Sequence, residues 1–181
     1  MKIILYDSTY KTFLGVAWKF SASKLYRWWG SSIGVKSWDD LIKKLQIRFN
    51  KTQKKFTHIQ IWGHGSPGFP SINKKGLSEQ NLKDLNQLVV PTSIIWFRSC
   101  AVFFGIEGYT FIKQITKILN CTIAGHTHNI GWPWHSGLYT VHVNKSLPLS
   151  ANKPNLINPL VSNKNEPRTI WVGQMTIPKG W

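Results

Sequence analysis

The chain has 181 residues, of which 42% are hydrophobic, so it can form one domain with a core and is too apolar to be disordered. With 23 basic and 7 acidic residues its net charge is +16, which attracts polyanions and acidic proteins without choosing among them. Two cysteines cannot build a disulfide framework, and no apolar run reaches the roughly 18 residues of a membrane span.

Residues 1–6 are apolar and β-prone and stop at Asp7, which predicts a first buried strand. The same stretch has one Lys and only a short apolar run, so it is typical of a strand and not of a signal peptide. Without a signal peptide or a membrane span, we expect a cytoplasmic protein.

Helical and extended patterns then alternate along the chain. Ser37 as a cap, Asp39 and Asp40 in a first turn and apolar residues at helical spacing predict a helix over 38–49. Similar patterns predict strands over 56–62, 93–97 and 121–124, and helices over 77–88 and 107–119. This alternation predicts a mainly parallel sheet with right-handed crossovers.

The C-terminal part of the chain has a different pattern. Residues 138–143 and 169–177 alternate apolar with polar side chains, which predicts antiparallel edge strands on either side of a Pro/Asn-rich loop. Because no repeat and no linker separates the parts, we expect one domain over residues 1–181.

Three of the predicted strands end in residues that can do chemistry. His64 follows the second strand, Cys100 follows the third, and His126 and His128 follow the fourth. Ligands of an open parallel sheet bind at the carboxyl ends of its strands, where these residues would meet. A Cys and a His at one sheet edge can form a nucleophile with its acid/base partner.

The neighbours of these two residues fit that chemistry. Arg98 and a downstream helix N-terminus would favour the thiolate of Cys100. Gly65 leaves its backbone N–H open to a substrate carbonyl, so the N–H groups of Gly65 and Cys100 could form an oxyanion hole.

Three segments resemble the caspase-like cysteine peptidases, above all the bacterial caspase-like domains related to the CHAT peptidases: HIQIWGHGSPG (58–68), SIIWFRSCAV (93–102) and AGHTHNIG (124–131). The resemblance implies a caspase-like three-layer α/β sandwich, its mainly parallel central sheet flanked by helices. It also implies that Cys100 is the nucleophile of a peptidase and His64 its general acid/base. The sequence around Cys100 lacks the Gln-Ala-Cys-Arg-Gly pattern of caspases, so their substrate preference does not transfer.

Further residues are expected to line the substrate cleft, namely Asp7, Arg98, Ser99, His126 and His128. The positive charge favours an acidic protein or peptide substrate, and the mechanism needs no metal or organic cofactor.

Two alternatives to the peptidase stay open. Gly-His-Thr-His (125–128) is similar to the last motif of calcineurin-like metallophosphoesterases, although the other motifs of that class are missing and acids are few. The chain could also be a catalytically inactive caspase-like protein-binding module. Residues 26–29 (Tyr-Arg-Trp-Trp) could stack on single-stranded nucleic acid, but no nucleic-acid-binding module is recognisable, so nucleic acid is not an expected partner.

Overall fold

A computed structural model describes residues 1–10, 31–131, 134–142, 169–173 and 176–177. Its central sheet has six strands in the spatial order β10 (Leu138–Val141), β8 (Thr122–His126), β7 (Val89–Arg98), β3 (Phe56–Trp62), β1 (Lys2–Asp7) and β2 (Ser31–Val35). All neighbours are parallel except β10, which runs antiparallel to β8 at the edge of the sheet. The predicted α/β class with a mainly parallel sheet is therefore confirmed.

Three helices in the described part of the chain connect the parallel strands: α2 (Trp38–Thr52), α3 (Glu79–Gln87) and α4 (Gly105–Ile118). The side chain of Ser37 accepts a hydrogen bond from the backbone N–H of Asp40 and so caps α2 as the sequence predicts. Ser78 and Asn81 form a capping box at the start of α3.

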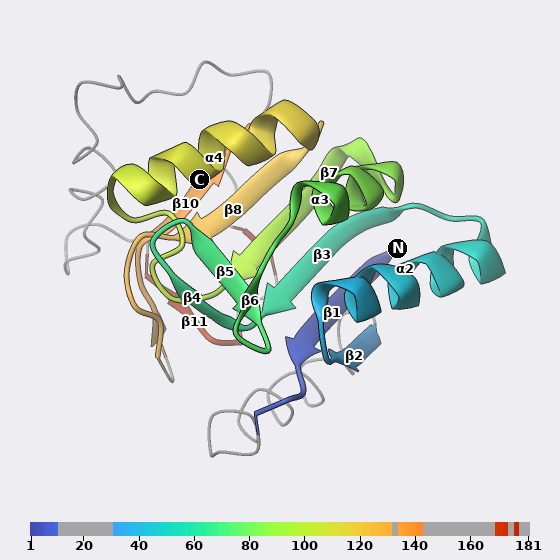
Figure 1. Ribbon diagram of the computed structural model, residues 1–181, viewed down its shortest axis with the longest axis horizontal. Helices are drawn as coiled ribbons and strands as arrows, with labels where there is room; N and C mark the ends of the chain where they lie inside the picture. The colour runs from blue at the N-terminus through green and yellow to red at the C-terminus, as the bar shows by residue number, and fades with distance from the viewer. Residues whose placement is uncertain (11–30, 132–133, 143–168, 174–175, 178–181) are drawn as a thin grey trace.

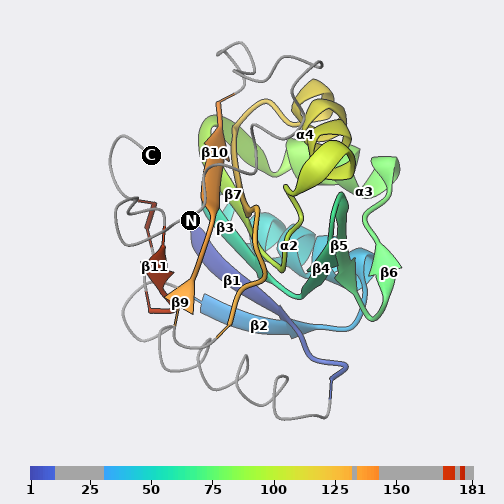
Figure 2. The same cartoon turned by 90° about the vertical axis from the view of Figure 1, so that its left-hand side faces the viewer.

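The two faces of the sheet are covered differently. Figure 2 shows α2, α3 and α4 on one side of the sheet and the strand pair of β9 (Trp134–His135) and β11 (Ile170–Trp171) on the other. The helices bury the larger hydrophobic core, which contains Leu5, Leu45 and Phe111. A smaller apolar cluster on the opposite face contains Trp96 and Ile170.

A three-stranded antiparallel sheet follows β3 directly and lies near the carboxyl ends of the parallel strands (Figure 1). It consists of β4 (His64–Ser66), β5 (Phe69–Ile72) and β6 (Lys75–Gly76). Glycine and proline are dense over residues 63–68, a composition typical of an open turn, so this sheet differs from what the sequence indicates. The segment 169–177 also differs, since its strand β11 pairs with β9 and not with the central sheet.

No helix in the described part of the chain is long and apolar enough to cross a membrane.

Candidate active site

The sheet brings the His64 and Cys100 segments together. β3 and β7 are neighbouring parallel strands, and their register pairs Trp62 with Arg98. His64 and Cys100 each come two residues after this last pair. They therefore leave the sheet at the same edge, as the parallel strand direction predicted from the sequence requires.

Gly65 shows how closely the two segments pack. A Cβ atom on this residue would lie 2.7 Å from the carbonyl oxygen of Cys100, 2.8 Å from Cβ of Ser99 and 2.6 Å from a methyl group of Val102. A Cβ atom cannot approach non-bonded carbon or oxygen atoms this closely, so only glycine fits at this position without a shift of the neighbouring segment. The chain next to His64 is thus in direct contact with the chain that carries Cys100.

Cys100 lies in a tight turn between β7 and α4 and is a partly exposed residue. The Sγ atom lies 3.6 Å from the carbonyl oxygen of Ile130, to which the thiol can donate. The backbone N–H of Ala101, a residue with a φ of 50°, donates to the carbonyl of His128 over 2.9 Å. The segment that follows β8 is therefore the third wall of the site.

His64 is half-buried, and its ring centroid lies 4.1 Å from that of Tyr10. Burial lowers the pKa of His64 below its usual 6.5, and the negative charge of Asp7 acts in the opposite direction. The imidazole is therefore mostly neutral at pH 7, which is the form that can accept a proton.

Asp7 ends β1 and is fully buried. One carboxylate oxygen accepts hydrogen bonds from the backbone N–H and the hydroxyl of Thr9, at 2.9 and 2.6 Å. The other accepts from the backbone N–H of Asn73, in the turn between β5 and β6, at 2.8 Å. Asp7 thus joins β1 to the small sheet that carries His64.

Arg98, Ser99 and His126, which were predicted to line the cleft, are all buried. His126 donates from Nδ1 to the carbonyl oxygen of Ser136 over 2.8 Å and accepts at Nε2 from the indole N–H of Trp96 over 3.3 Å. Burial lowers the pKa of His126 to about 3, so the ring is neutral. A cleft role for these three residues stays a prediction.

His128 is partly buried, and its Nδ1 lies 2.9 Å from the hydroxyl of Thr127. In the described ranges, no three His, Cys, Asp or Glu side chains gather in a way that could hold a metal ion. The second cysteine, Cys121, is buried in the main core, and burial raises the pKa of its thiol to about 12.

Sequence reasoning missed three contributors to the site. Tyr10 contacts His64, Asn73 hydrogen-bonds Asp7, and the backbone carbonyl of Ile130 faces Cys100. Only Tyr10 follows a predicted strand end closely enough for its position to be inferred. The other two contribute backbone groups, which the sequence does not mark.

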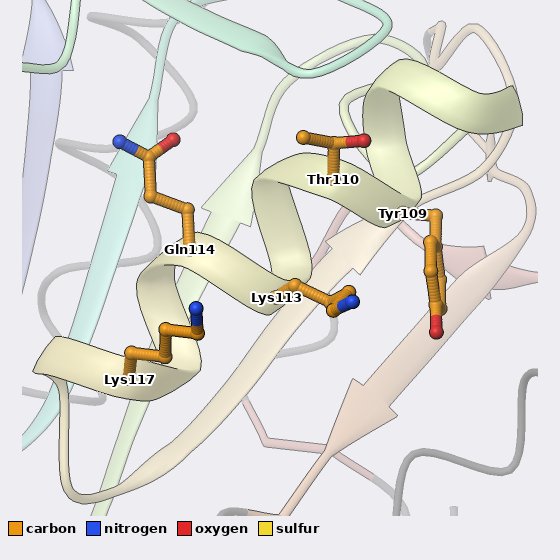
Figure 3. Close-up of a pocket in the computed structure, with 5 residues that line it drawn as sticks. All are labelled: Tyr109, Thr110, Lys113, Gln114 and Lys117. Carbon is orange, nitrogen blue, oxygen red and sulfur yellow. The ribbon is translucent and has the colours of Figure 1, made fainter. Parts of the chain in front are cut away.

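A shallow hollow of about 430 Å³ lies along α4 and contains none of the predicted site residues. Tyr109, Lys113 and Lys117 line it (Figure 3), with the Lys113 ammonium 5.7 Å from the centre of the Tyr109 ring.

No protein-family model and no curated protein sequence matches this chain. Among solved structures, the fold is similar to that of a secreted C11 cysteine protease from Bacteroides thetaiotaomicron, solved with an irreversible peptide inhibitor. The TM-score is 0.49 at 9% identity, over 71% of this chain and 49% of the protease, so the chain spans about half the length of that protein. An aromatic amino acid aminotransferase from Burkholderia cenocepacia matches less well, with a TM-score of 0.36 at 8% identity over 68% of this chain and 30% of the enzyme.

Proposed function

We propose that this protein is a cysteine-dependent peptidase in which Cys100 is the nucleophile and His64 the general acid/base. The observation that carries the proposal is the close approach of Gly65 to the carbonyl oxygen of Cys100 and to Cβ of Ser99, which sets the segment that carries the imidazole against the turn that carries the thiol. A partly exposed cysteine and a half-buried, neutral histidine are the pair that acyl transfer from a peptide needs.

The reaction would begin when His64 takes the proton of the Cys100 thiol and the sulfur attacks the scissile carbonyl carbon. The backbone N–H groups of Gly65 and Cys100 would donate to the developing oxyanion. His64 then returns its proton to the leaving amine as the C–N bond breaks. A water molecule, deprotonated by His64, hydrolyses the thioester and releases the acid, after which the proton returns to the sulfur.

Asp7 would support His64 through its charge. Its carboxylate is held by three hydrogen bonds, and its negative charge acts to raise the pKa of the imidazole. A fixed negative charge stabilises the imidazolium that forms after the first proton transfer. In this proposal Asp7 is a positioning residue that does not contact the substrate.

The net charge of +16 favours a protein or peptide substrate with acidic residues. No observation favours the phosphoesterase alternative over the peptidase, because both ring nitrogens of His126 are engaged by protein groups. A metal ligand needs one of these nitrogens with its lone pair available.

The proposal is tested by incubating the full chain with a mixture of fluorogenic peptides that vary in the residue before the cleavable bond. We expect turnover that Cys100→Ala abolishes, that the matched core variant Cys121→Ala keeps, and that a chelator leaves unchanged. Peptide turnover by Cys100→Ala would overturn the proposal.

Two further results would favour the alternatives. Hydrolysis of a phosphate ester that survives Cys100→Ala and stops with chelator would identify a metallophosphoesterase. No turnover of any peptide, together with a Cys100 thiol of ordinary reactivity, would identify the inactive binding module.

A further inference from the structure

Arg98 ends β7 on the sheet face opposite the helices. It lies between two indole rings, with the guanidinium carbon 4.2 Å from the centre of Trp96 and 4.7 Å from that of Trp62. Only 1% of the residue is exposed. A permanently ionised side chain is thus enclosed in an aromatic environment, which is costly unless the charge and its donors are satisfied.

The hydrogen bonds of this guanidinium are incomplete. Its Nη1 donates to the side-chain oxygen of Gln60 over 3.1 Å, and the same oxygen accepts from the indole N–H of Trp62 over 3.0 Å. Nε and Nη2 have no hydrogen-bond partner among the described residues. These two nitrogens lie side by side on one edge of the planar group, where their N–H bonds are nearly parallel.

The charge of Arg98 also lacks a counter-ion within the described ranges. Six of the seven acids of the chain are described: Asp7, Asp39, Asp40, Glu79, Asp84 and Glu107. None of these forms an ion pair with Arg98, and the ion pairs found there join Asp40 to Lys44 and Glu79 to Lys83. Burial lowers the pKa of Arg98 only to about 9, so the group is still a cation at pH 7.

The histidines beside the guanidinium are not its counter-ions either. His126 and His135, whose ring centroids lie 5.6 Å apart, are both buried. Burial and the nearby charge of Arg98 lower the pKa of His135 to about 2, so it is neutral. The Nδ1 atom of His135 has no hydrogen-bond partner in the described part of the chain. The cluster therefore offers open polar atoms from both β7 and β9.

We propose that Arg98 is the centre of a second binding site, on the sheet face opposite α2, α3 and α4, for a small molecule that carries a carboxylate. The open Nε/Nη2 edge matches the two oxygens of a carboxylate in a bidentate pair, and a carboxylate supplies the missing negative charge. The flanking Trp62 and Trp96 rings favour a ligand with an apolar or aromatic body.

Because Arg98 is enclosed, we expect a ligand to bind to it slowly. In the described structure the cluster is covered in part by β9 and β11, which are joined over only two residue pairs. A ligand reaches Arg98 only when such a covering segment opens, so the protein must be equilibrated with ligand before each measurement.

The test is thermal unfolding of the full chain after overnight equilibration with sodium benzoate, sodium acetate, or sodium chloride at equal ionic strength. We expect a saturable rise of the melting temperature with the carboxylates over chloride, roughly 5 °C or more when the ligand is at about 100 times its Kd. Arg98→Met should abolish this rise without lowering the melting temperature of the unliganded protein, because it removes a buried unpaired charge. Lys117→Met, which removes an equal charge from the exposed side of α4, should keep the full rise.

Arg98→Lys is the second variant, to be used if Arg98→Met does not fold. Lysine keeps the charge but loses the planar pair of N–H donors. We expect it to need about tenfold or more carboxylate for the same rise. No rise over chloride in the unmodified protein, or an equal rise in the Arg98 variants, would overturn the proposal. So would a rise that appears only in a Glu166→Gln variant, since a carboxylate of the chain would then be the partner of Arg98 in the unmodified protein. All these readouts are independent of peptidase activity.

Discussion

Gly65 is the residue at which the candidate site is most sensitive to a single atom. Adding one methyl group with Gly65→Ala would place a carbon 2.6–2.8 Å from Val102, Cys100 and Ser99, two of these contacts being with backbone or Cβ atoms that cannot rotate away. We expect a loss of about 1–3 kcal/mol of unfolding free energy and a separation of the two segments. Urea unfolding and the alkylation rate of Cys100 measure the two effects. A Gly65→Ala protein with unchanged stability and unchanged Cys100 reactivity would contradict the packing described above.

Asp7 permits a prediction about the titration of its neighbour. Because its charge opposes the effect of burial on His64, Asp7→Asn should lower the pKa of His64 further. The acidic limb of any His64-dependent reaction then moves to lower pH. An NMR titration of the imidazole, assigned with a His64→Gln spectrum, measures the shift.

Asp7→Asn should also cost about 1–3 kcal/mol of unfolding free energy. An amide has one acceptor oxygen, whereas the carboxylate accepts backbone N–H groups from Thr9 and Asn73 on separate oxygens. Asp84→Asn removes the same charge from α3 and is the control. A His64 pKa that rises in Asp7→Asn, or falls equally in Asp84→Asn, would refute a direct electrostatic contact.

At the scale of elements, the β5–β6 turn carries strain that can be removed. Asn73 and Lys74 both have positive φ values, 51° and 62°, as a two-residue type I′ hairpin turn requires. The second of these positions favours glycine, so Lys74→Gly should stabilise the protein by about 0.5–1 kcal/mol. Denaturant unfolding measures this gain. Lys75→Gly, one residue later in β6, should instead destabilise it, and equal effects of the two changes would contradict the turn assignment.

The elements also show what the sequence could predict. Regular patterns located β1, β3 and the three helices of the described residues to within a few residues, because buried faces repeat at the helical or strand period. The strand predicted over 93–97 begins earlier, at Val89, because Val89 pairs with Phe56 before a register shift whose extra residues, Pro91 among them, lie in β7. Such pairing across a proline depends on the neighbouring strand and is not a local property.

The β4–β6 sheet was not predicted, and tertiary contacts explain why. The indole N–H of Trp38 donates to the backbone of Lys75, and the backbone of Asn73 donates to Asp7. These contacts hold a Gly- and Pro-rich segment in strand form although its composition favours a loop. For the site, the predicted parallel direction of the strands was enough to predict that His64 and Cys100 leave the same sheet edge. The sequence did not predict that Arg98 is buried, because its burial depends on distant segments that cover the sheet face opposite the helices.

For the whole molecule, the buried histidines predict a loss of stability in acid. The folded protein keeps His126 and His135 neutral, with pKa values of about 3 and 2, whereas the unfolded chain binds protons below pH 6.5 or so. Their contribution is fully present above that pH and declines as the pH falls, by up to about 1.4 kcal/mol per pH unit for each histidine.

Urea unfolding at pH 7, 6 and 5 measures this slope. His135→Phe should reduce this slope by about the contribution of one histidine, whereas Gln114→Ala, an exposed change that adds and removes no titratable group, should leave it unchanged. A stability that is constant over this range, or an equal effect of both variants, would contradict the burial of neutral imidazoles.

The central claim, that His64 acts on the Cys100 thiol, is tested most directly by the alkylation of Cys100 with iodoacetamide as a function of pH, followed by mass spectrometry. Buried Cys121, whose thiol has a pKa of about 12, is the internal reference in every sample. We predict that Cys100 reacts faster than a free cysteine near neutral pH and that His64→Gln slows it about tenfold or more. A Cys100 that reacts at the rate of an ordinary thiol, equally in the unmodified protein and in His64→Gln, would contradict the account.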